Sequence, residues 1–92
     1  MYERLGQEIG QLVDKKQAAY GNSFDIMPEI FKLLYPSGIT EKQYGDLLTI
    51  IRIMDKIIRI SRGNKEAFGE NPYKDIAGYG LLGVGTSERK NR

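Results

Sequence analysis

The sequence predicts an all-α protein, a compact bundle of about four helices that forms a homo-oligomer. Apolar residues recur at steps of three and four along most of the 92 residues. Helix-start signals alternate with glycine or proline stops, and no segment has the convincing alternation of a β-strand. Because a chain this short leaves much of its surface exposed, we expect association between copies to complete the fold.

Composition limits the chemistry that the chain can perform. It has no cysteine and no histidine, which excludes a disulfide framework, a thiolate nucleophile, a Ser-His-Asp triad and zinc sites built on those residues. We predict no catalytic residue, no metal ligand and no cofactor, and Mg²⁺ enters only with the enzymatic alternative below. A net charge of +2 makes nucleic acid an unexpected partner. A charged N-terminal segment and the lack of an apolar run of ~20 residues predict a cytoplasmic protein with no membrane partner.

The first predicted helix covers residues 2–19 and ends at Gly21, which suits a left-handed cap. Its stripe at helical spacing is Leu5, Ile9, Leu12, Lys16 and Ala19. The second covers residues 25–35, with Ser23 or Asp25 as its cap and Pro28 in the first turn, where a missing N–H costs least.

The third predicted helix has the clearest start, a capping box from Thr40 to Gln43. It runs over residues 41–62, about 33 Å, and ends at Gly63. Apolar residues cover most of its circumference, which predicts a central helix surrounded by the others.

The fourth predicted helix covers residues 72–84, with Asn71 as cap and Pro72 as first residue. Four glycines make it a poor helix in isolation. Residues 1–85 are expected to form a single domain and residues 86–92 a polar, flexible tail.

The polar side of the third helix carries the principal functional candidate. Arg52, Lys56 and Arg59 follow one another at steps of four and three, and we call them the cationic strip. A solvated helix face is one interpretation. Since the helix is expected to be central, the other is that the strip faces a cleft, a subunit boundary or a phosphate-bearing ligand. Asp55 beside it suits an ion pair best, with a ligand hydroxyl or Mg²⁺ as alternatives.

Other candidate ligand residues lie around the strip, and each also has a structural interpretation. Lys16 suits a helix C-terminus, Ser23 and Asp75 suit the first turns of helices, and Tyr20 and Tyr79 suit packing. As ligand residues, the two tyrosines would stack on a base, while Ser23 would bind phosphate at a helix N-terminus. The predicted ligand set is Lys16, Tyr20, Ser23, Arg52, Asp55, Lys56, Arg59, Asp75 and Tyr79.

The same residues resemble a phage-borne family of unknown function, the nucleotide-modification-associated domain family. The likeness covers about residues 15–82. It is carried by Lys15-Lys16, Tyr20-Gly21-x-Ser23, Arg52-x-x-Asp55-Lys56-x-x-Arg59 and Asp75-Ile76-Ala77-Gly78-Tyr79. The resemblance implies a connection with nucleotides and a phage setting, hence the host cell cytoplasm.

More distantly, the chain resembles the MazG-like all-helical nucleoside-triphosphate pyrophosphohydrolases. Those enzymes hold Mg²⁺ with a Glu-Glu-x-x-Glu run on one helix and Glu-x-x-Asp on the next. This chain lacks that run, and its acids are scattered, for example at Glu29, Asp46, Asp55 and Asp75. Cations bind phosphates but do not themselves activate water, so the departure favours binding over catalysis.

Three functions follow from these patterns. The first is a non-catalytic protein that binds a nucleotide, including cyclic ones, and sequesters a host immune signal as phage anti-defence proteins do; that comparison depends on size and setting. The second is a Mg²⁺-dependent pyrophosphohydrolase using Asp55, Asp75 and Glu29. The third is an interaction module whose glycine-rich fourth helix and basic tail dock a partner.

Overall fold

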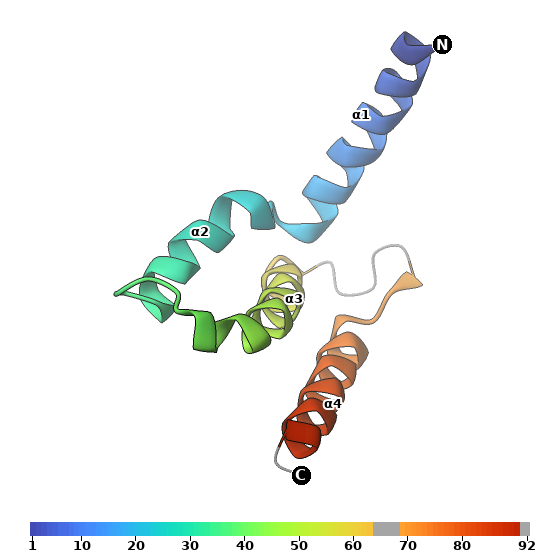
Figure 1. Ribbon diagram of the computed structural model, residues 1–92. Coiled ribbons are helices and arrows are strands. Elements are labelled where there is room, and N and C mark those ends of the chain that lie inside the picture. The colour runs from blue at the N-terminus through green and yellow to red at the C-terminus, as the bar shows by residue number, and fades with distance from the viewer. Residues whose placement is uncertain (64–68, 91–92) are drawn as a thin grey trace.

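The computed structural model describes residues 1–63 and 69–90, and every regular element in these ranges is helical. The order along the chain matches the four predicted helices, with one short 3₁₀ turn added (Figure 1). The elements are α1 (Tyr2–Tyr20), α2 (Ser23–Leu34), η1 (Glu41–Gln43), α3 (Tyr44–Ser61) and α4 (Pro72–Lys90).

Helix α3 is the element on which the others pack, as its apolar circumference predicted. The main contacts of α1, α2 and α4 are all with α3, and those with α4 are the most extensive (Figure 1). The capping box that precedes α3 is present, since the Thr40 amide donates to Gln43 Oε1 at 2.8 Å. The segment 41–43 is a 3₁₀ turn, so the α-helix itself begins at Tyr44.

A sharp elbow joins α1 to α2. Gly21 caps α1 in the left-handed conformation with φ of 85°, as predicted, and Asn22 adopts the same region with φ of 56°. The Asn22 side chain accepts a hydrogen bond from Gln17 and donates one to Asp25. A Cβ at Gly21 would clash with Cγ of Arg62, so the elbow lies directly against the end of α3.

Helix α2 begins earlier than the sequence predicted. Its first residue is Ser23 and neither Ser23 nor Asp25 is its cap, because left-handed Asn22 turns the chain straight into the helix. Pro28 is therefore the sixth residue of α2, beyond the first turn where we expected it. There its ring nitrogen deprives the Phe24 carbonyl of its helical donor.

Helix α4 continues six residues past the predicted end at Val84, and its four glycines do not interrupt it. Asn71 caps it as predicted, with Oδ1 accepting from the amides of Tyr73 at 3.0 Å and Lys74 at 3.3 Å. Basic residues in the last turn suit the negative end of the helix dipole. Residues 86–90 of the predicted tail are thus helical, and residues 91–92 lie outside the described part.

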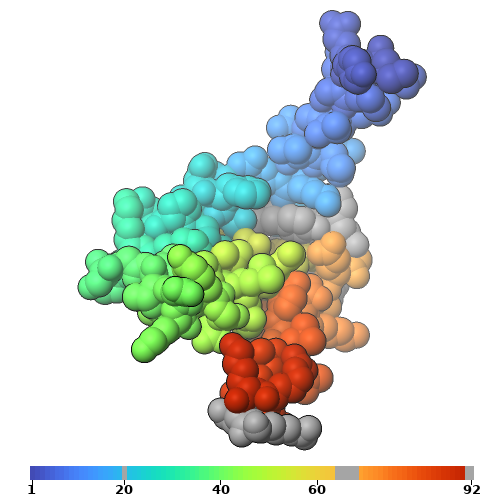
Figure 2. Space-filling model, viewed as in Figure 1, coloured from blue at the N-terminus to red at the C-terminus, as the bar shows by residue number. Residues whose placement is uncertain are grey.

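The overall shape differs from the predicted compact bundle. Helix α1 extends as an arm from the body formed by α2, α3 and α4 (Figure 2). The molecule measures 51 × 30 × 29 Å, and its radius of gyration of 16.2 Å compares with about 12 Å for a compact domain of this length. The bundle prediction is wrong for α1 because only its C-terminal end reaches α3.

The interior is small. Among the described residues, the buried positions are Met27, Ile58, Arg59 and Pro72, so only two large apolar side chains are buried. None of the described helices combines the length and the apolar character needed to cross a bilayer.

Candidate functional site

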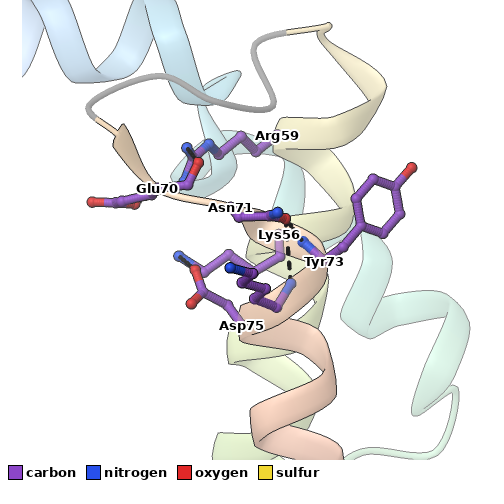
Figure 3. Close-up of polar contacts among 7 residues, drawn as sticks. Lys56, Arg59, Glu70, Asn71, Tyr73 and Asp75 are labelled. Carbon is purple, nitrogen blue, oxygen red and sulfur yellow. Dashed lines mark hydrogen bonds and ion pairs between the residues drawn. The ribbon is translucent and has the colours of Figure 1, made fainter.

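The C-terminal member of the cationic strip lies inside the protein. Arg59 is 1% exposed, and its Nη1 lies 2.7 Å from Oε2 of Glu70 (Figure 3). Its Nη2 also donates to the main-chain carbonyl of Glu70 at 3.1 Å. Arg59 therefore fixes the segment that leads into α4, and a phosphate would have to compete with the Glu70 carboxylate for it.

The middle member of the strip also faces an acid of the same chain. Lys56 Nζ lies 3.4 Å from Oδ2 of Asp75, in the first turn of α4 (Figure 3). Both side chains are partly exposed, so solvent screens the pair and its contribution to stability is modest, roughly up to 1 kcal/mol. The pair joins α3 to α4 one turn before Arg59.

Arg52, the N-terminal member, has a different environment. It is exposed, and within the described part of the chain no carboxylate lies within ion-pair distance of it. Together with Asp55 it lines a groove of about 370 Å³ between α2 and α3, which we call the α2–α3 groove. The remaining lining residues are mostly apolar: Ser23, Phe24, Met27, Pro28, Phe31, Leu48 and Ile51.

The sequence of α2 builds the apolar wall of this groove. Phe24, Met27, Pro28 and Phe31 are spaced at three, four and seven residues, which places them on one face of a helix. Phe31 is held edge-to-face against Tyr35, with ring centroids 6.1 Å apart. Phe24 is 92% exposed, so its ring meets solvent, whereas Phe31 is half-buried.

A second hollow adjoins the groove at the elbow. It holds about 280 Å³ and shares Ser23 and Phe24 with the α2–α3 groove. Helix α1 contributes Lys16 and an apolar edge made by Leu12 and Val13. The two hollows are neighbours that share Ser23 and Phe24, and each has one cation in its lining, Lys16 on α1 and Arg52 on α3.

The structure thus divides the predicted ligand residues into two groups. Ser23, Arg52 and Asp55 line one groove, and Lys16 shares the adjoining hollow with Ser23. Lys56, Asp75 and Arg59 take part instead in ion pairs that hold the start of α4. Half-buried Tyr79 lies one turn beyond Asp75 on α4. The side chain of Tyr20 lies outside the described part of the structure.

Sequence reasoning missed two kinds of residue. The apolar wall of α2 could have been found, since Phe24 and Phe31 stand one heptad apart beside the predicted site. Glu70 could not, because no local pattern indicates which cation a loop residue will meet.

The acids expected for the enzymatic alternative do not gather. Asp55 lines the α2–α3 groove, Asp75 pairs with Lys56, and Glu29 pairs with Lys32 on α2 at 3.0 Å. Across residues 1–63 and 69–90, no three potential metal-binding side chains lie close enough to share an ion. The described residues thus contain no cluster that would hold Mg²⁺ through protein carboxylates.

Comparison with protein-family models, curated proteins and solved structures finds no match to this chain. The resemblance to the phage-borne family therefore stays a prediction from the motifs quoted above, and function is argued from the groove itself.

Proposed function

We propose that the protein binds a nucleoside phosphate in the α2–α3 groove without transforming it. The observation that carries the proposal is the position of Arg52. Of the three cations in the strip it alone has no carboxylate within ion-pair distance in the described part of the chain, and it stands at the edge of an aromatic groove.

The size and composition of the groove support this proposal. Its volume of about 370 Å³ falls in the range of small-molecule sites, roughly 300–1,000 Å³. A base would lie against exposed Phe24 and half-buried Phe31. The Arg52 guanidinium would bind phosphate through its planar set of donors, and Asp55 would accept a hydrogen bond from a ribose hydroxyl or a base amino group.

Of the three residues in the cationic strip, we therefore assign phosphate binding to Arg52 alone. Lys56 and Arg59 position the start of α4, and Lys16 in the adjoining hollow lies where a longer phosphate chain or a second nucleotide unit would reach. A cyclic dinucleotide signal, sequestered intact as the phage setting suggests, would place one nucleotide unit in the α2–α3 groove and the other in the neighbouring hollow. Because the described residues hold no cluster of carboxylates for Mg²⁺, we favour binding over hydrolysis.

Isothermal titration of the full chain tests the proposal. The ligands are adenosine and guanosine mono-, di- and triphosphates, cyclic dinucleotides and inorganic phosphate, all at one low salt concentration. We expect at least one nucleotide to bind with Kd below 1 mM. Arg52→Met should raise that Kd about 10- to 100-fold, because a charge-assisted hydrogen bond contributes about 1.5–3 kcal/mol.

Arg89→Met is the matched control, since Arg89 is equally exposed but lies near the end of α4 and bonds only locally to Thr86 at 3.1 Å. It should leave Kd within twofold of the wild-type value. Chromatography of the ligand after incubation with Mg²⁺ should return it intact. Absence of binding by every nucleotide, or equal affinity in the Arg52 variant, would refute the site, and turnover would favour the hydrolase.

A further inference from the structure

We propose that the apolar face of α1 is covered by α1 of a second copy of this chain, the two helices running antiparallel. We infer this assembly from the α1 face alone, whether or not the nucleotide proposed above binds. The face, which we call the α1 face, consists of Tyr2, Leu5, Ile9, Leu12 and Val13.

Nothing in the described part of the chain covers this face. Ile9 is 60% exposed and Leu12 is 48% exposed, and every residue from 1 to 18 is classed as exposed. A Cβ built at Gly6 or Gly10 would meet open space, so no other described element approaches the helix there (Figure 2). An isolated helix of 19 residues with two glycines is marginal in water, so α1 needs a packing partner to persist.

The exposed area of the whole chain sets an upper limit on the size of the missing contact. The chain exposes 7391 Å², whereas a folded monomer of 10.4 kDa exposes about 5,400 Å². The excess of about 2,000 Å² comes from the whole chain, including the α1 face and exposed residues elsewhere such as Leu33 and Leu81, and it lies in the range that one protomer contributes to an obligate homodimer, roughly 1,000–2,500 Å².

The small interior argues that the partner is another copy. With Met27 and Ile58 as the large apolar side chains buried among the described residues, the chain has little core of its own. We therefore expect the chain to need the α1 contact in order to fold, so the partner must be present whenever the chain is synthesised. A second copy is always present at equal stoichiometry and presents the same stripe, as a two-fold interface requires.

Charge and dipole favour the antiparallel orientation. Side chains in the first half of α1, Glu3, Arg4 and Glu8, sum to −1, and those in the second half, Asp14, Lys15 and Lys16, sum to +1. Antiparallel pairing sets each half against the opposite half and also aligns opposite ends of the helix dipoles.

The pairing would also reach the hollow at the elbow. Leu12 and Val13 belong both to the α1 face and to the hollow that Lys16 and Phe24 line. A second α1 lying on that face would close the side of the hollow that is open to solvent. The elbow hollow and the neighbouring α2–α3 groove would then lie beside the boundary between the two copies.

Sedimentation equilibrium gives the first test. Wild type should be dimeric or a higher even oligomer at 10 µM, and Ile9→Glu should weaken its self-association at least 100-fold. Gln7→Glu adds the same charge on the opposite side of α1 and should leave the oligomer unchanged. A folded, monomeric wild type at 100 µM would overturn the proposal and leave the α1 face to a different partner.

Cross-linking tests the arrangement even if Ile9→Glu fails to fold. Because the chain has no cysteine, each single-cysteine variant reports one position. Under mild oxidation Ile9→Cys, near the middle of α1, should form disulfide-linked dimers at least tenfold faster than Gln7→Cys or Tyr2→Cys. Equal rates at Ile9 and Gln7 would overturn the α1 contact, and equal rates at Ile9 and Tyr2 would overturn the antiparallel orientation.

Discussion

The buried ion pair between Arg59 and Glu70 gives a quantitative test of how the cationic strip is divided. Glu70→Gln removes the carboxylate charge but keeps an amide oxygen and the main-chain carbonyl that accepts from Arg59. The guanidinium, which is 1% exposed, then loses the Glu70 carboxylate as a counter-charge.

The magnitude follows from burial on each side of the pair. Breaking a fully buried pair costs about 3–5 kcal/mol. The Glu70 side chain is 45% exposed, and solvent reaching it screens the pair, so we take about 1.5 kcal/mol, near the lower bound for a charge-assisted hydrogen bond. For a domain of this size that loss lowers Tm by about 6–12 °C.

Thermal unfolding followed by circular dichroism measures this loss, with all variants at one protomer concentration because association also shifts Tm. Glu29→Gln is the matched control. It removes the same charge from an ion pair with Lys32 in which both side chains are about 70% exposed, so it should cost under about 0.5 kcal/mol. Equal Tm values for the two variants would refute the assignment of Arg59 to a structural role.

Two further substitutions, one of them with a control inside α4, test the geometry at the ends of the helices. Gly21→Ala should lower the free energy of unfolding by about 1–2 kcal/mol, because φ there is 85° and the new Cβ meets Arg62. Gly78→Ala is the control, since it lies at a helical position where a Cβ meets nothing. It should leave the free energy of unfolding unchanged or raise it by up to about 1 kcal/mol. Urea unfolding compares them, and equal effects would contradict the left-handed elbow. Asn71→Ala should cost about 1 kcal/mol through loss of the N-cap of α4, and an unchanged urea midpoint would show that the cap contributes nothing.

Local signals predicted the helices well where they depend on a few neighbouring residues. The Thr40–Gln43 capping box, the left-handed Gly21 and the Asn71 cap all hold as expected. Errors arose where the local signal was ambiguous. No sequence signal indicated that Asn22 would share the left-handed conformation of Gly21, so that α2 begins at the next residue, Ser23.

The prediction of a compact bundle assumed that every apolar helix face is covered by another helix of the same chain. The stripe of α1 was recognised, but amphipathic spacing does not say whether the covering helix belongs to the same chain. In the structure Ile9 and Leu12 face solvent, so the stripe finds no cover among the other helices described.

The candidate site was predicted in part for a related reason. Helical spacing placed Arg52, Lys56 and Arg59 on one side of α3. In the structure Arg52 lines the α2–α3 groove, whereas Lys56 and Arg59 pair with acids at the start of α4. Which of them stays available to a ligand depends on where Asp75 and Glu70 come to lie, and these acids follow α3 in the chain. That tertiary information cannot be obtained from the periodicity of one helix.

We propose that the α2–α3 groove, and not the paired cations beside α4, receives the ligand. Amide chemical-shift mapping by NMR tests it most directly, with the ¹⁵N-labelled protein titrated by the nucleotide that binds tightest. The account predicts that the largest shifts fall at Ser23, Phe24, Arg52 and Asp55 and that they saturate together. Shifts confined to Glu70 and Asp75, or none at millimolar nucleotide, would contradict it.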